Sequence, residues 1–443
     1  DQLCMAVPPF FTGILISWLF SITLRWFVHG QFPDLGADPT GAFRYLFFAA
    51  AAIAIPRIAM TVRMLRSTIQ GEMRRDYVRT AISRGNDRGA VLRRHVLRNA
   101  LVPVVTFLAQ TMAEIVAAGI VVEQVFAIPG LQPGLPRGAG HRGDPGLLGG
   151  AGRHRGRHCQ PADRPPPAAG RCVMKRRMNG YLLAGLIVTG LMAALILVGL
   201  VWTPYDPDAL LAGPKLEGPS LAHWLGTDSF GRDIFSRVLQ GAGTTFLIAL
   251  STVAIGAVCG TAAGALTGYF GGVVDEVLMR LNDALTAFPS ILLALVLISI
   301  LGPGNKYNVV IALGIVFIPS FARVTRTAFA ALRDVNYVKS ARLMGASSGR
   351  ILVRQILPNT TQVLLPAITI GFNNAVLAEA SMSYLGIGVT PPDASLGYML
   401  SEAQGMLTSA PWYALGSGGA IVLLIFGVGL IGEGLQRRNG GVS

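Results

Sequence analysis

Apolar residues form long runs along this chain, and short basic, proline-rich or glycine-rich stretches separate the runs. A helix needs roughly 20 apolar residues to cross the roughly 30 Å of hydrocarbon in a bilayer. The pattern predicts an all-α membrane protein, a polytopic transmembrane helix bundle with six spans in its second half and about three in its first. The spans are expected at about 10–27, 42–64, 101–126, 181–202, 246–270, 285–301, 309–329, 364–387 and 412–431.

One basic stretch between two runs has the pattern of two short helices joined by a glycine bend. Residues 337–363 contain four basic residues and no acidic residue: Lys339, Arg342, Arg350 and Arg354. Apolar positions three apart are expected on one side of the first helix: Val338, Ala341 and Met344. Gly345 and Gly349 then break the run, and a second short helix is expected to end at Pro358. Such a loop is expected on the cytoplasmic side of the membrane.

The same stretch occurs a second time, 260 positions earlier (337 − 77). At this offset the two copies align without a gap, and identical residues match: Tyr77 with Tyr337, Ala81 with Ala341, Gly85 with Gly345, and Leu97 with Leu357. Two gapless copies of one bent basic loop indicate a duplicated module.

The pattern of an alanine, a glycine four residues later and a second short helix resembles the cytoplasmic coupling loop of ABC importer permeases. Motifs around it are similar to those of the dipeptide, oligopeptide and nickel permeases of that class: LGTD at 225–228, GYFGG at 268–272, AFP at 287–289 and EASMSYLGIG at 379–388. Residues 174–443 resemble the second permease subunit of this family. Residues 1–131 resemble a truncated first permease subunit.

The resemblance implies that the loops dock on two separate ATPase subunits and couple ATP-driven closure to alternating access. Contact or bend residues are expected at matching positions of the two loops: Tyr337, Ala341, Gly345 and Leu357, with Tyr77, Ala81, Gly85 and Leu97. Further expected partners are an extracytoplasmic solute-binding protein, a second permease subunit and the lipid bilayer of the inner (plasma) membrane. The cargo is expected to be di- or oligopeptides, with a nickel chelate or another small solute as the alternative.

No catalytic motif is apparent, so the chain is expected to be no enzyme. It has no glycine-rich phosphate loop ending in Gly-Lys-Ser/Thr, and ATP is therefore expected only on the separate subunits, with no cofactor in this chain. The four cysteines and six histidines show no metal-ligand spacing, so no metal site is expected.

Polar residues near the spans are candidates for the translocation path and for the outer surface. Asn373, Asn374 and Glu379 either line a path for a zwitterionic peptide or join helices by hydrogen bonds. Asp228 and Arg232 belong to a stretch predicted outside and are candidates for contact with the binding protein. Alanine at either is expected to impair uptake and leave expression intact. Glu114 either faces neighbouring helices or lines a cavity.

Composition supports the membrane assignment. The chain is 52% hydrophobic, with 14% charged residues and a mean hydropathy of +0.52. Its net charge is +14, but the basic residues cluster in loops beside spans. They are therefore expected to set the orientation in the membrane, and nucleic acid is not expected as a partner.

The chain is expected to divide into three parts. Residues 132–173 are rich in glycine, proline and arginine and can neither bury a core nor cross a bilayer, so they form either a flexible linker or a segment read out of frame. Residues 1–131 would be a truncated permease half and residues 174–443 a complete six-span permease. Two other functions stay open: a secondary transporter, which would carry paired charges or broken helices at matching positions of two halves, and a non-functional fused remnant.

Overall fold

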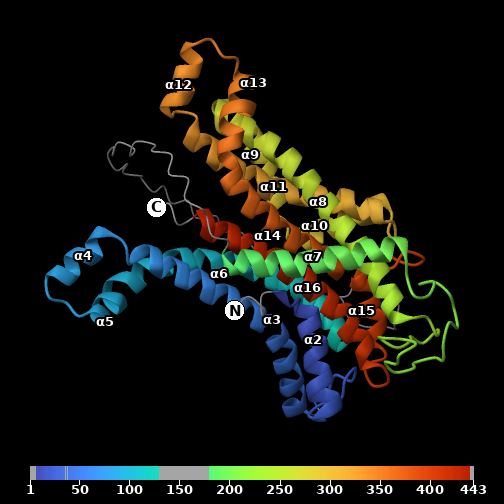
Figure 1. Cartoon of the computed structure of the whole chain (residues 1–443). Coiled ribbons are helices and arrows are strands. Elements are labelled where there is room, and N and C mark those ends of the chain that lie inside the picture. Colours follow the sequence, from blue (N-terminus) through green and yellow to red (C-terminus); the bar gives the residue numbers. More distant parts are fainter. Residues whose placement is uncertain (1–5, 35, 37, 129–178, 440–443) are drawn as a thin grey trace. The chain divides into compact units, whose positions relative to one another are not determined.

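The computed structural model describes residues 6–34, 36, 38–128 and 179–439 (Figure 1). The predicted linker at 132–173 lies outside these residues. In chain order the elements are α2 (Pro9–Ile16), η1 (Ser17–Thr23), α3 (Pro39–Glu72), α4 (Asp76–Ser83), α5 (Arg88–Val91), η2 (Leu92–Val96), α6 (Leu97–Phe126), α7 (Gly180–Val201), α8 (Ile234–Phe270), α9 (Gly272–Thr286), α10 (Ser290–Leu301), α11 (Lys306–Leu332), α12 (Asn336–Leu343), α13 (Ser348–Ile351), η3 (Leu352–Ile356), α14 (Leu357–Tyr384), α15 (Leu396–Gln404) and α16 (Pro411–Asn439). The prediction of an all-α membrane protein is confirmed.

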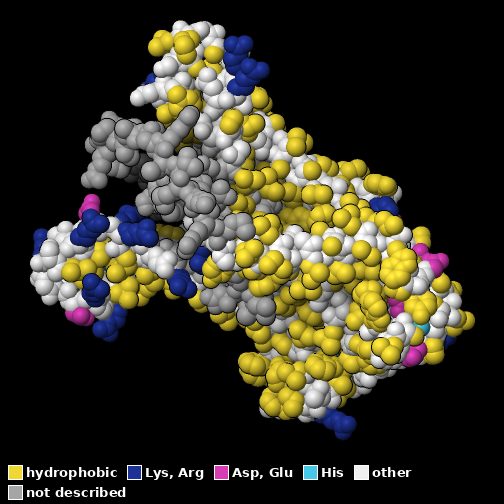
Figure 2. All heavy atoms as spheres, viewed as in Figure 1, with side chains coloured by type: hydrophobic (Ala, Val, Ile, Leu, Met, Phe, Trp, Pro, Cys, Tyr) yellow, Lys and Arg dark blue, Asp and Glu magenta, His cyan; other side chains and the backbone are white. Residues whose placement is uncertain are grey.

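Six helical segments among the described residues are long and apolar enough to span a membrane: α3, α7, α8, α11, α16 and the continuous segment Ser348–Tyr384. Two bent helix pairs raise the number to as many as eight, namely Arg88–Ala109 with Glu114–Val125, and α9 with α10. The second half therefore has six spans when its bent pair is included, as predicted. Lys and Arg side chains gather on the α4–α5 and α12–α13 loops, and apolar side chains cover much of the remaining helices (Figure 2).

Three segments differ from the sequence prediction. The first apolar run forms α2 and η1, which together cover only Pro9–Thr23 and are shorter than a full span. The segment 271–283, which lies between the predicted spans 246–270 and 285–301, forms most of α9, because Val273, Val277 and Leu281 recur at helical spacing between its charged residues. Helix α15 lies in a segment where no helix was predicted.

The long helices α8 and α11 pack closely through a stripe of four glycines: Gly256, Gly260, Gly264 and Gly268. A Cβ atom added at Gly260 would lie 2.6 Å from the carbonyl oxygen of Ile318, and one at Gly268 would lie 2.6 Å from that of Arg326. Small residues at this spacing let two helix backbones approach in lipid. The glycine repeat therefore serves the close packing of α8 on α11.

The described residues before 129 and after 178 form one compact unit. Phe10 stacks on Tyr384 with ring centroids 5.4 Å apart, and both belong to one buried apolar cluster. Gln404 Nε2 donates a hydrogen bond of 2.9 Å to the carbonyl oxygen of Val125, near the end of α6. The two halves thus share a core rather than being joined only through the chain between them.

Candidate functional site: two bent basic loops

The second basic loop is a sharp reversal between α12 and α13. Gly345 adopts φ +78°, a left-handed conformation that side chains with a Cβ rarely take. The N–H of Gly345 donates to the carbonyl of Arg342, and the N–H of Ala346 donates to that of Ala341, both at 3.0 Å. This is the hydrogen-bond pattern of a helix that ends on a left-handed glycine, so Gly345 is the bend residue.

A small apolar core fixes this loop to the ends of two spans. Val338, Ala341, Ile351 and Ile356 are buried together with Tyr269 at the end of α8 and Phe329 near the end of α11. Arg342 also donates from Nε to the Tyr269 hydroxyl at 3.3 Å, and its guanidinium lies 5.0 Å from the centre of that ring. The loop is therefore packed as one unit against the ends of α8 and α11.

The second arm of the loop does not end at Pro358, so that prediction is wrong. Pro358 lies in the first turn of α14, where its missing N–H is tolerated, and the wide π-helical turn η3 directly precedes it. The arm and the following span form one helical segment, Ser348–Tyr384.

The first loop repeats this geometry. The bounds of α4, α5 and η2 and the first residue of α6 each lie 260 positions before those of α12, α13, η3 and α14. Gly85 adopts φ +84°, and Val78, Val91 and Val96 form the buried core of this loop. The repeat predicted from the sequence therefore extends to the backbone, including the π-helical turn.

The structure places the predicted loop residues in different environments. Ala341 is 1% exposed and belongs to the loop core, which leaves it no surface for a partner. Tyr337 is exposed, and its hydroxyl accepts a hydrogen bond of 3.3 Å from Asn359 Nδ2. Met344, predicted on the same side as Ala341, is 80% exposed, because α12 ends one residue before it.

In the first loop, Ala81 is half-buried and packs against the core of this loop. Leu97 is half-buried at the start of α6. The Tyr77 hydroxyl donates a 2.8 Å hydrogen bond to Glu72 Oε2. Desolvation raises the pKa of Tyr77 above its usual value, so the phenol remains the proton donor in this pair.

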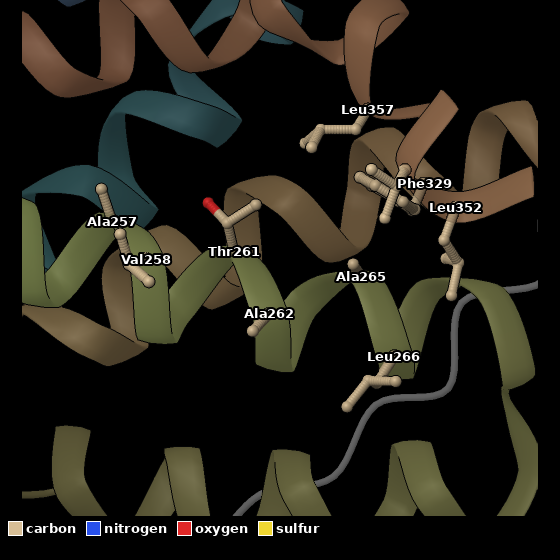
Figure 3. Close-up of a pocket in the computed structure, with 10 residues that line it drawn as sticks. Ala257, Val258, Thr261, Ala262, Ala265, Leu266, Phe329, Leu352 and Leu357 are labelled. Carbon is tan, nitrogen blue, oxygen red and sulfur yellow. The ribbon is translucent and has the colours of Figure 1, made fainter. Parts of the chain in front are cut away.

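Leu357 lines an apolar pocket of about 580 Å³ between the second arm and α8 (Figure 3). Leu352, Leu357 and Phe329 form one side of it. The α8 side chains form the other: Ala257, Val258, Thr261, Ala262, Ala265 and Leu266. Thr261 supplies the one polar side chain among the lining residues, so this pocket lacks the charged groups that would recognise a zwitterionic peptide.

Asp228 lies in a buried ionic cluster at the opposite end of α8. Its carboxylate accepts hydrogen bonds from Arg232 Nε at 2.7 Å, Arg237 Nη1 at 3.0 Å and the backbone N–H of Phe230 at 2.8 Å. With 1% exposure, Asp228 is not available for contact with a binding protein, and we assign it a structural role instead. Arg232 is also largely buried, with a side-chain exposure of 12%.

The candidate path residues on α14 are not equivalent. Glu379 is fully buried, and its Oε1 accepts a hydrogen bond of 2.8 Å from Ser383 one turn later. A buried side chain lines no open path, so a role for Glu379 there would require another conformation. Asn373 is half-buried and Asn374 is exposed, and their contribution to a path stays a prediction.

Glu114 forms an ion pair with Arg57, which joins α6 to α3. This favours the interpretation that Glu114 faces a neighbouring helix. The positions that correspond to this pair in the second half, at the offset of 260, are Phe317 and Asn374. The Arg57–Glu114 pair is therefore not repeated at the matching positions of the second half.

A buried Ser-His-Asp group near the ionic cluster around Asp228 does not form a nucleophilic triad. One carboxylate oxygen of Asp233 accepts a hydrogen bond of 2.7 Å from Ser236 Oγ. Its other oxygen lies 2.9 Å from His223 Nδ1, with which it pairs. The serine is therefore bonded to the carboxylate rather than to the imidazole that would have to accept its proton. Within the described residues, no three His, Cys, Asp or Glu side chains are grouped to hold a metal ion.

Comparison with known proteins agrees with this geometry. A family model described as "Binding-protein-dependent transport system inner membrane component" matches residues 2–149 and 260–440. The chain is 39% identical over 222 residues to a dipeptide transport system permease protein of Alkalihalophilus pseudofirmus, which covers 50% of this chain and 73% of the relative. It is 39% identical over 255 residues to a glutathione transport system permease protein of Pectobacterium atrosepticum, covering 56% of this chain and 84% of the relative.

A dipeptide transport system permease protein of Haemophilus influenzae is 37% identical over 266 residues, which cover 59% of this chain and 90% of the relative. The family model matches both halves, as the duplicated loop indicated, and the predicted resemblance to ABC importer permeases is confirmed. The chain belongs to the family of inner-membrane components of binding-protein-dependent transport systems.

Proposed function

We propose that this chain is the permease of an ATP-driven importer of di- or oligopeptides in the inner membrane. The observation that carries the proposal is the pair of bent basic loops, alike in backbone and 260 residues apart, in a member of this permease family. Relatives with about 39% identity are named for the transport of dipeptides and of glutathione, a tripeptide, which favours a peptide over a nickel chelate.

The loops act as levers between separate ATPase subunits and the spans. ATP is bound by two such subunits, whose closure pushes the loops. The second loop is fixed to α8 and α11 by its buried core and continues into α14, so the push moves three spans together. A movement of this kind is a two-state rigid-body transition that switches access from one side of the membrane to the other.

The other proposed partners follow from the importer class. An extracytoplasmic solute-binding protein delivers the peptide, and a second permease subunit completes the path across the bilayer. A secondary transporter is disfavoured because the Arg57–Glu114 pair has no charged counterpart in the second half. A non-functional remnant is disfavoured because the first half contributes Phe10 and other side chains to a shared core.

Co-purification with candidate ATPase subunits tests the proposal. We expect the wild-type chain to retain them in detergent and Gly345→Val to retain about tenfold less. The reason is that a left-handed backbone costs a side chain roughly 1–2 kcal/mol, so valine shifts the bend. Uptake of a labelled dipeptide into proteoliposomes that hold the assembled importer is expected to fall in parallel.

Two matched variants control for the change of side chain. Gly345→Asn is expected to keep most of the binding, since asparagine tolerates the left-handed region. Gly349→Val adds the same side chain four residues away, at a glycine without positive φ and with no atom within 4 Å of its added Cβ, and is expected to bind normally. Failure of the wild-type chain to retain any ATPase subunit would contradict the proposed function.

A further inference from the structure

Helix α8 covers one row of residues on α11. Ile318, Ala322 and Arg326 recur every four residues along α11, and their backbone atoms lie against the glycine stripe of α8. Cβ atoms added to two of these glycines would lie 2.6 Å from carbonyl oxygens of the row. The row is therefore a contact surface for a helix that presents a small residue at every fourth position.

The first half contains the same row on α3. Helices α3 and α11 end 260 positions apart, at Glu72 and Leu332, and each is followed by its bent loop. At this offset the α11 row corresponds to Ile58, Val62 and Arg66, which we call the α3 row. Its first and last residues are of the same type as those of the α11 row. The repeat of the two loops therefore extends into the preceding spans.

The α3 row differs from the α11 row in what covers it. Ile58 is 60% exposed and Val62 is 47% exposed, whereas Ala322, which corresponds to Val62, is 1% exposed. No element of the described chain lies on the α3 row as α8 lies on α11. Lipid tails suit the isoleucine and the valine as well as a helix does, so the charged end of the row decides between the two.

Arg66 is the charged end of the α3 row. Its counterpart Arg326 donates from Nη2 to Asp275 Oδ2 at 2.6 Å and from Nε to the other carboxylate oxygen, just beyond the end of α8. Arg66 is exposed, and among the described residues it has no hydrogen-bond or ion-pair partner. A bidentate pair of guanidinium and carboxylate adds geometric specificity, so Arg66 favours a helix that brings a carboxylate to this place.

We infer that the α3 row binds a transmembrane helix of another polypeptide. That helix presents small residues at every fourth position, which lie on Ile58 and Val62. An acidic residue follows the last of them by seven positions, the spacing of Gly268 and Asp275 (275 − 268), and pairs with Arg66. The inference rests on the repeat of the α11 row in α3 and does not depend on the proposed function.

A synthetic peptide of residues 244–280 is the probe, because it contains the glycine stripe of α8 and Asp275. It is labelled and added to the full-length chain in lipid nanodiscs. A photoreactive residue replaces Val62, or in the control Ile187, which is 61% exposed on α7. We expect capture of the peptide through position 62 to exceed capture through position 187 about tenfold.

A change in the stripe tests the contact between helices. A peptide with Gly260→Leu and Gly264→Leu stays as apolar but cannot approach a neighbouring backbone closely. Its capture through position 62 is expected to be about tenfold lower than that of the parent peptide.

An exchange of charge identifies the site. Arg66→Glu in the chain is expected to lower capture of the parent peptide about tenfold, and Asp275→Arg in the peptide is expected to restore capture by this variant. The charge-reversed peptide would meet Arg326 if it displaced α8, so restored capture reports on α3. Arg66 is exposed, so Arg66→Glu is expected to elute from size-exclusion chromatography like the parent.

Equal capture through positions 62 and 187 would mean that lipid covers the α3 row, and it would refute the inference. Capture through position 62 that does not respond to the leucine exchange, or to the exchange of charge, would refute it as well. These measurements involve neither ATPase subunits nor uptake, so a negative result leaves the proposed function unaffected.

Discussion

Replacing Gly264 with leucine is expected to abolish correct packing of α8 on α11. A Cβ atom at this position would collide with the carbonyl oxygen of Ala322 and would lie 2.7 Å from Thr325 Cβ. A backbone carbonyl cannot turn aside as a side chain can, so the two helices must separate. Overpacking typically costs about 1–3 kcal/mol, and a clash with a backbone carbonyl is expected at the upper end of this range. The measurement is the yield of monodisperse protein in size-exclusion chromatography after detergent extraction, which we expect to fall to near zero.

A glycine in another span provides the control. Gly190 lies in α7, and a Cβ atom added there would meet no heavy atom within 4 Å. Gly190→Leu adds the same side chain to a span and is expected to keep the yield of the parent. Equal yields from the two leucine variants would show that the glycine stripe does not determine the approach of α8 and α11.

Replacing Asp228 with alanine is expected to lower strongly the thermal stability of the part of the protein around the start of α8. The guanidinium of Arg237 has an exposed side-chain fraction of 3% and would lose one of its two carboxylate partners, keeping Glu402 at 2.9 Å. Removing one partner from a buried ion pair costs about 3–5 kcal/mol, because the remaining charge stays buried. Asp228→Ala is therefore expected to reduce the amount of folded protein. If Asp228 were an exposed contact residue, the variant would instead lose uptake while its expression stayed normal.

Thermal unfolding in detergent, followed by intrinsic fluorescence, measures the effect. Asp393→Ala is the matched control, since it removes an ion pair of 3.0 Å with Lys306 whose side chains are 38% and 40% exposed. Solvent screens such a pair, and its loss is expected to change the midpoint little. A midpoint for Asp228→Ala that equals the control's would mean that the cluster around Arg237 does not hold this part of the fold.

Local features of the sequence were sufficient for much of the candidate site. The bend at Gly345 was predicted because a glycine that interrupts an apolar helical pattern marks a turn, and the offset of 260 transferred the same prediction to Gly85. The end of the second arm was misplaced because Pro358 was taken as a helix terminator. A proline in the first turn of a helix breaks no hydrogen bond, and only the helical context shows which case applies.

The exposure of the charged and apolar residues could not be predicted in the same way. Asp228 was a candidate for contact with the binding protein because its stretch was predicted outside, yet it is buried and paired with Arg232 and Arg237. Met344 was expected with Ala341 on one side of a helix, but α12 ends at Leu343 and turns Met344 outward. Both errors concern contacts or helix ends that a periodic pattern does not contain.

The sequence by itself determined the class of this protein, most of its spans and the two bent loops, because a bilayer demands long apolar segments and a left-handed turn favours glycine. The tertiary structure decided which polar groups are buried, that the loop arm continues into α14, and that the two halves share a core. These properties depend on pairs such as Arg237 with Glu402, and Phe10 with Tyr384, that lie far apart along the chain. A local sequence pattern shows which side chains of a segment are to be buried. Which distant residues bury them depends on the tertiary structure.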